Sequence, residues 1–234
     1  MAKRDLLLDI GNTRIKWCYA FDGGLQPGSL DAGTLEEFQE HCSRTPEGMP
    51  NRILLSSVSA ETMIEAVIEC CSERFDLTPT RLRSRAEQGG VTNGYADPES
   101  LGVDRWLAIV GAVARYGKPV IIWDMGTATT LDAVDRYGQH IGGWILPGPE
   151  TMLESLTDQT QLNVPEELSV TEHDAVIPPG RDTAEAIRQG VYAAQKGALN
   201  QFMKNFDPAG GEQPRIVVTG GAAMSLLEYL EHAV

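Results

Sequence analysis

The chain has 234 residues, 42% of them apolar and 22% charged, which is the composition of an ordinary globular protein with one large or two smaller domains. Nineteen basic residues against thirty-three acidic ones give a formal net charge of -14, which disfavours a polyanion such as nucleic acid as the ligand. No apolar run approaches the roughly 18 residues of a membrane span, and the three leucines before Asp9 are too few for a signal peptide. We therefore expect a cytoplasmic protein that binds neither nucleic acid nor membranes.

Strands and helices alternate along the first half of the chain. Leu6 to Asp9 is predicted to be a strand, with Ile15 to Tyr19 as its antiparallel partner across a short turn, and residues 52–58 form a third strand. Apolar residues at helical spacing predict helices over residues 60–74 and 102–117. The predicted buried face of the second helix consists of Val103, Trp106, Leu107, Val110 and Val113. This alternation indicates an α/β architecture.

The second half of the chain repeats this organisation. Strands are predicted at residues 120–123, 129–134, 142–149 and 215–219, the third of them broken by Pro147 and Gly148. The polar segment from Thr157 to Asp182 shows little periodicity and is a candidate lid. A helix is predicted over residues 183–203, with its buried face formed by Ile187, Val191, Ala194, Ala198 and Phe202, and another from about Ala223 to His232. We expect an N-terminal lobe at residues 1–117 and a C-terminal lobe at residues 118–234.

Two similar turns follow strands, at Asp9 to Thr13 and at Asp124 to Ala128. Glycine lets the backbone turn sharply and present N–H groups to a phosphate, and small polar residues add donors without bulk. The aspartate that ends each strand could hold a cation beside the phosphate. The candidate phosphate-binding residues are Gly11, Asn12, Thr13, Gly126, Thr127 and Thr129. The alternative is that each segment is only a hairpin turn, but two in phase at strand ends favour a nucleoside triphosphate gripped between two lobes.

Asp104 and Arg105 lie side by side at the start of a predicted helix. In one reading Asp104 complements the helix dipole and Arg105 is a surface residue. In the other, Asp104 accepts the proton of an attacking hydroxyl, while Arg105 draws in an anionic substrate group or steadies a transferring phosphate. The spacing alone leaves both readings open.

Six segments, in order, resemble the type III pantothenate kinases of the acetate and sugar kinase, heat-shock chaperone and actin superfamily. They are DIGNT at residues 9–13 followed by Lys16, YADPESLGVDR at 95–105, DMGTATTLD at 124–132, GGWILPG at 142–148, GRDTAEAIRQG at 180–190 and TGGAA at 219–223. The resemblance implies two actin-like, ribonuclease H-like lobes with an ATP cleft between them. It also implies phosphorylation of pantothenate to 4'-phosphopantothenate by ATP, the first step of coenzyme A biosynthesis.

The resemblance further implies roles for individual residues. Asp104 and Arg105 would be catalytic, with Asp104 the general base. ATP and its phosphates would contact Asp9, Gly11, Asn12, Thr13, Lys16, Gly126, Thr127, Thr129, Gly220 and Gly221. Pantothenate would contact Tyr95, Gly102, Val103, Asp104, Arg105 and, from the partner subunit of a homodimer, the residue that corresponds to Thr183. Mg²⁺ would accompany ATP, and a monovalent cation, K⁺ or NH₄⁺, would lie near Asp124.

Two other functions fit parts of the sequence. One is a kinase of the same superfamily that phosphorylates a sugar or another alcohol, against which the Tyr95 to Arg105 motif argues. The other is a regulatory homologue without catalysis, against which the presence of Asp9, Asp104 and Asp124 argues.

Overall fold

The computed structural model describes residues 4–11, 14–22, 24–25, 30–44, 49–159, 177, 179–206 and 213–223. The chain divides into two compact units. Unit 1 comprises Met1–Arg85 with Asp97–Leu107, and unit 2 comprises Ala86–Ala96 with Ala108–Val234. The chain passes between the units for the last time inside helix α3 (Val103–Tyr116). This last crossing, between Leu107 and Ala108, precedes the lobe boundary that we expected after residue 117, and the lobe boundary itself stays a prediction.

Unit 1 is built on a six-stranded sheet. Its strands are β1 (Arg4–Ile10), β2 (Ile15–Phe21), β3 (Gly24–Leu25), β4 (Asp31–Gly33), β5 (Arg52–Ser57) and β6 (Thr80–Arg81), in the order β3-β2-β1-β5-β6 with β4 paired to β2. β1 runs antiparallel to β2 and parallel to β5, which confirms the three strands expected from the sequence. Every second residue of β1 from Leu6 to Ile10 is buried, as the two-residue period of a strand requires.

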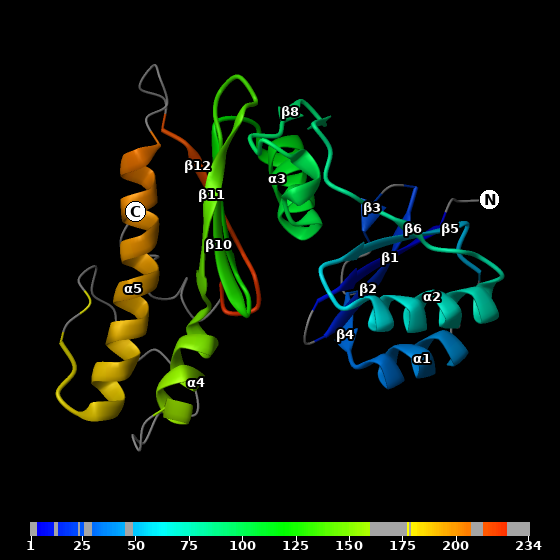
Figure 1. Cartoon of the computed structure of the whole chain (residues 1–234), viewed down its shortest axis with the longest axis horizontal. Helices are drawn as coiled ribbons and strands as arrows, with labels where there is room; N and C mark the ends of the chain where they lie inside the picture. The colour runs from blue at the N-terminus through cyan, green and yellow to red at the C-terminus, as the bar shows by residue number, and fades with distance from the viewer. Residues whose placement is uncertain are drawn as a thin grey trace. The chain divides into compact units, whose positions relative to one another are not determined.

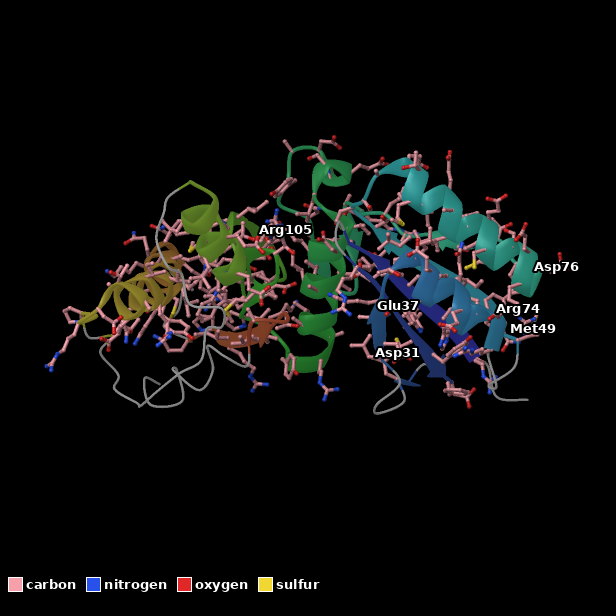
Figure 2. The ribbon with its side chains drawn as sticks, turned by 90° about the horizontal axis from the view of Figure 1, so that it is seen from below. Asp31, Glu37, Met49, Arg74, Asp76 and Arg105 are labelled. Carbon is pink, nitrogen blue, oxygen red and sulfur yellow. The ribbon has the colours of Figure 1, made fainter. Side chains whose placement is uncertain are left out.

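Two helices, α1 (Leu35–Arg44) and α2 (Glu61–Phe75), pack against this sheet (Figure 1). Helix α1 was not expected from the sequence, although a capping box marks its start. The Thr34 N–H donates to Glu37 Oε2 over 2.7 Å, and the Glu37 N–H donates to Thr34 Oγ1 over 3.3 Å. Arg74, in the last turn of α2 and labelled with Glu37 in Figure 2, donates from Nε to the Cys42 carbonyl over 2.7 Å. This bond ties the ends of the two helices together.

Unit 2 contains a four-stranded sheet of β9 (Val120–Met125), β10 (Ala128–Val134), β11 (His140–Pro147) and β12 (Arg215–Thr219). The order is β11-β10-β9-β12, with β12 parallel to β9 and the other neighbours antiparallel. Helix α5 (Thr183–Asn205) lies along the sheet, and α4 (Pro149–Gln159) follows β11 (Figure 1). The core between α5 and the sheet includes Ile121, Trp123, Leu131, Tyr192, Leu199 and Phe202. A short ribbon of β7 (Glu87–Gln88) and β8 (Val91–Thr92) and the 3-10 helix η1 (Pro98–Ser100) precede α3.

The two sheets repeat one arrangement. In each, a strand-turn-strand hairpin is followed later in the chain by a strand that pairs in parallel with the first strand of the hairpin: β1, β2 and β5 in unit 1, and β9, β10 and β12 in unit 2. The two turns noticed in the sequence therefore occupy equivalent positions. None of the helices in the described part of the chain has the length and hydropathy needed to cross a bilayer.

Three details differ from the sequence-based expectations. Helix α4 begins at Pro149 and ends at Gln159, so it overlaps the start of the segment expected to lack regular structure. On α5, Ala194 is exposed, whereas Tyr192, Gln195 and Leu199 are buried. On α3, Ile109 and Ala112 are buried and Leu107 and Val110 are only partly so. Most of the candidate lid, and the helix expected from Ala223 to His232 apart from its first residue, lie outside the described residues.

Candidate active site

The first candidate phosphate turn joins β1 to β2 in unit 1. The Gly11 N–H donates to the Arg14 carbonyl over 3.0 Å and closes the turn between the two strands. Asn12 and Thr13 lie outside the described residues. The described part of the turn is a tight connection directly after Asp9 and Ile10, as the sequence predicted.

Asp9 lies between two polar neighbours on adjacent strands. The strand register pairs it with Lys16 on β2 and with Ser56 on β5, and Lys16 Nζ lies 3.8 Å from Asp9 Oδ2. Burial raises the pKa of Asp9 above its ordinary value, and the negative charge of Asp104 adds to the rise, while Lys16 opposes it. Asp9 and Asp104, both in unit 1, are therefore close enough for their negative charges to repel each other.

The start of α3 presents the candidate base. Asp104 is exposed, and its Oδ1 accepts a hydrogen bond of 2.8 Å from the backbone N–H of Arg105. A Cβ at Gly102 would lie 2.7 Å from that same oxygen, so glycine leaves the space that the carboxylate occupies. Arg105, labelled in Figure 2, is 8% exposed. The reading of Arg105 as a surface residue is therefore wrong.

A cavity of about 370 Å³ lies beside this helix start in unit 1, a size suited to a small organic ligand. Two of the residues expected to bind substrate, Gly102 and Val103, are among those lining it. Its polar lining includes Ser57, Arg81, Arg83, Ser84, Glu99 and Ser100. The serines and the two arginines were not selected from the sequence. Ser57, Arg81, Arg83 and Ser84 precede the Tyr95 to Arg105 motif, and Ser100 lies within it at a position to which no role was assigned.

The second candidate turn joins β9 to β10 in unit 2. The Gly126 N–H donates to the Ala128 carbonyl over 3.1 Å. The Thr127 carbonyl accepts two hydrogen bonds, of 2.9 Å from the Gly148 N–H and of 2.7 Å from Thr151 Oγ1. A Cβ at Gly148 would overlap the Gly126 carbonyl oxygen, so only glycine permits this close approach. Gly148, the glycine that ends the GGWILPG segment, thus packs directly against the turn.

Gly220 packs against the other side of the same turn. It has a φ of +99°, and a Cβ there would lie 2.5 Å from the Met125 nitrogen and closer still to the Met125 carbonyl. The Met125 carbonyl also accepts a 3.0 Å hydrogen bond from the Ala222 N–H. A Cβ at Gly221, in contrast, would meet no atom of the described structure within 4 Å. The two glycines of the TGGAA segment therefore have different roles, and Gly220 fixes the turn.

Asp124 occupies in unit 2 the place that Asp9 occupies in unit 1. The register pairs it with Thr130 on β10 and with Thr219 on β12. The Thr127 side chain is exposed and free to meet a ligand, whereas Thr129 is fully buried, and its hydroxyl has no hydrogen-bonding partner among the described residues. Thr130 and Thr219 were missed from the sequence, since only the strand register places them beside Asp124.

The remaining expected substrate residues are Tyr95 and Thr183, both in unit 2. The Tyr95 ring stacks on the imidazole of His140, with 6.0 Å between ring centroids. Thr183 is exposed at the start of α5, where Asp182 caps the helix by accepting a 2.8 Å hydrogen bond from the Glu185 N–H.

The described residues contain no group of three or more histidine, cysteine, aspartate or glutamate side chains arranged to hold a metal ion. Mg²⁺ bound with a nucleotide needs only one or two protein carboxylates, because water and the phosphates supply its other ligands. Asp9 and Asp124, each at the end of a strand beside a turn, fit this requirement.

Comparison with known proteins identifies the family. A sequence model described as type III pantothenate kinase matches residues 5–205. The chain belongs to the type III pantothenate kinase family. It is 35% identical to the type III pantothenate kinase of Azoarcus sp. (strain BH72), over 96% of this chain and 82% of the relative. It is 32% identical to that of Cellvibrio japonicus (strain Ueda107), over 93% of this chain and 86% of the relative.

Solved structures identify the fold of this type III pantothenate kinase family member. The ethanolamine utilization protein EutJ from Carboxydothermus hydrogenoformans superposes with a TM-score of 0.55, at 13% identity, over 97% of this chain and 80% of that one. The fold is actin-like, as the repeated sheet order also indicates and as the sequence predicted.

Proposed function

We propose that the protein transfers the γ-phosphoryl group of ATP to pantothenate and yields ADP and 4'-phosphopantothenate, the first step of coenzyme A biosynthesis. The observation that carries this proposal is the family match over residues 5–205, which spans both turns and the whole of the Tyr95 to Arg105 segment. Relatives that share about a third of the sequence over nearly the whole chain bear the same name.

In the proposed reaction Asp104 is the general base. The hydroxyl oxygen of pantothenate forms a bond to the γ-phosphorus, the bond from that phosphorus to the bridging oxygen of ADP breaks, and the hydroxyl proton passes to Asp104. Phosphoryl transfer asks a protein mainly for positioning and charge stabilisation, so one carboxylate with well-placed donors is sufficient. The exposed carboxylate of Asp104 and the space left by Gly102 support this role. The guanidinium of Arg105 would hold an anionic group of the substrate.

The two turns would bind ATP. The proposed phosphate contacts are the small polar side chains and backbone N–H groups of Asn12, Thr13 and Thr127, together with Asp9 and Lys16. Gly11 and Gly126, whose own N–H groups close the turns, would let the backbone approach the phosphates, and the buried Thr129 would support the second turn from beneath. Gly220 and Gly221 would lie on the adenosine side. Mg²⁺, when bound with ATP, neutralises part of the phosphate charge. A monovalent cation, K⁺ or NH₄⁺, would be held near Asp124, whose neighbours Thr130 and Thr219 could add oxygen ligands.

We further propose a cytoplasmic homodimer in which Thr183 of each subunit reaches the pantothenate pocket of the other. The exposure of Thr183 at the start of α5 supports this role, because a side chain there can contact a neighbouring molecule.

The experiment that tests the proposed substrate measures ADP release from ATP with a panel of acceptors: pantothenate, glycerol and several sugars, each with Mg²⁺ and K⁺. Of these acceptors, we expect pantothenate and no other to support ADP release. Release with a sugar or glycerol and none with pantothenate would establish another kinase of the superfamily. A folded protein that releases no ADP with any of these acceptors would instead favour the regulatory homologue.

A further inference from the structure

Asp132 and His140 form a buried pair inside unit 2 that the proposed chemistry does not use. His140 Nε2 lies 2.9 Å from Asp132 Oδ1. The His140 side chain is 0% exposed and the Asp132 side chain 2% exposed. A carboxylate withdrawn from water to this extent requires hydrogen-bond donors to remain ionised. The pair joins the end of β10 to the start of β11, next to an irregularity in their register.

The second ring nitrogen of His140 identifies its tautomer. The Gly94 N–H donates to Nδ1 over 3.4 Å, so Nδ1 is an acceptor and carries no proton. Nε2 then carries the ring proton and donates it to Asp132. A carboxylate placed in this way fixes both the tautomer and the orientation of an imidazole. Gly94 is also held close, since a Cβ there would overlap the His140 carbonyl oxygen.

The oriented imidazole supports the Tyr95 ring. The two rings are stacked with an angle of 15° between their planes and 6.0 Å between their centroids. The backbone around Tyr95 is docked separately, because the Tyr95 N–H donates to Asn93 Oδ1 over 2.9 Å and the Thr92 N–H donates to the Gly138 carbonyl over 2.9 Å. Those bonds fix the main chain, and the stacked His140 ring is a contact to the Tyr95 side chain itself.

We propose that His140, oriented by Asp132, is a positioning residue that holds the Tyr95 ring ready to bind pantothenate. The inference rests on the proposed function, which assigns Tyr95 to the pantothenate pocket. It adds two residues that act on pantothenate affinity through Tyr95. Without the imidazole the tyrosine ring loses one supporting face, and part of the binding energy is then spent on ordering it. The turn between β9 and β10 keeps its own contacts with Gly148 and Gly220, so ATP binding is unaffected.

The test compares the Michaelis constants for pantothenate and ATP in the wild type, His140→Ala and His140→Gln. Glutamine can still donate an amide hydrogen bond to Asp132 but offers no ring to Tyr95. We expect both variants to raise KM for pantothenate by about fivefold, the order of an aromatic pair contact, with KM for ATP changed less than about twofold. We expect the glutamine variant to melt closer to the wild type than the alanine variant, because Asp132 keeps a donor.

Val134→Ala is the matched control. Val134 is fully buried and is the cross-strand partner of His140, so its truncation weakens the same corner of the sheet without touching the contact to Tyr95. It should lower the melting temperature and leave KM for pantothenate unchanged. In a Tyr95→Ala background, adding His140→Gln should have no further effect on KM for pantothenate, since the residue through which His140 acts is gone.

A folded His140→Gln protein with the wild-type KM for pantothenate would overturn the positioning role. An equal rise in both Michaelis constants, or an effect that persists in the Tyr95→Ala background, would also overturn it. Failure of the proposed function can be told apart from these results, because the wild type itself would then form no phosphopantothenate. The positioning role would be refuted in that case as well.

Discussion

Gly148→Ala should damage the turn between β9 and β10 from outside the turn. The added Cβ would lie 2.8 Å from the Thr127 carbonyl oxygen and closer still to that of Gly126. Restoring ordinary van der Waals separation requires the two backbone segments to part by more than about 1 Å. This shift would break the 2.9 Å hydrogen bond from the Gly148 N–H to Thr127.

The expected cost has a structural and a catalytic part. Overpacking of this kind costs about 2 kcal/mol of stability. For a chain of this size that free energy lowers Tm by about 6 °C. A displacement of about 1 Å at a phosphate-binding turn should reduce kcat/KM for ATP by about 100-fold. Thermal melting and steady-state kinetics with ATP as the varied substrate measure the two effects.

Gly190→Ala supplies the control for Gly148→Ala. A Cβ at Gly190, on α5, would meet no atom of the described structure within 4 Å, so the same chemical change should stabilise the helix by about 0.5 to 1 kcal/mol and leave kinetics unchanged. A Gly148→Ala protein with the wild-type Tm and kcat/KM would refute the argument that this glycine is required by the close approach to the turn.

Three further predictions concern the charged groups of the site. Asp104→Asn should lower kcat by at least about 100-fold, the usual contribution of a general base, with KM for ATP nearly unchanged; a wild-type rate would remove Asp104 from the mechanism. Because burial raises the pKa of Asp9, ionising it disfavours the folded state, so Asp9→Asn should raise the melting temperature at pH 7 while reducing activity. That gain should shrink as the pH falls towards the ordinary carboxyl value of 3.8, and a gain independent of pH in melts from pH 7 to 4 would contradict it. Replacing K⁺ by Na⁺ at constant ionic strength should reduce kcat sharply, and equal rates in the two salts would argue against a specific cation site near Asp124.

Strand-level features of the fold could be predicted from local patterns. The hairpin from Leu6 to Tyr19 is marked by an apolar strand, a short polar turn and a second apolar strand, and it forms as expected. Helix α1 was overlooked, although Thr34 and Glu37 carry the spacing of a capping box. Ala194 was placed on the wrong face of α5 because the helix buries Gln195, whose Nε2 donates to the Pro147 carbonyl over 2.9 Å. A buried glutamine with a long-range partner cannot be inferred from a hydrophobic period.

The candidate site was predictable where its residues are adjacent in the chain. The turn at Gly126 and the helix start at Asp104 are local features, and both have the expected local geometry. The contact between Tyr95 and His140 joins positions far apart in sequence and depends on how β8 docks beside β11. The burial of Arg105 and of Thr129 likewise depends on tertiary packing, which the residue type does not reveal.

The most direct test of the central claim is mass spectrometry of the products formed from ATP and pantothenate by the purified protein with Mg²⁺ and K⁺, with Asp104→Asn alongside. We expect 4'-phosphopantothenate in the wild-type reaction and only a trace with the variant. A folded wild-type protein that leaves pantothenate unmodified under these conditions would contradict it.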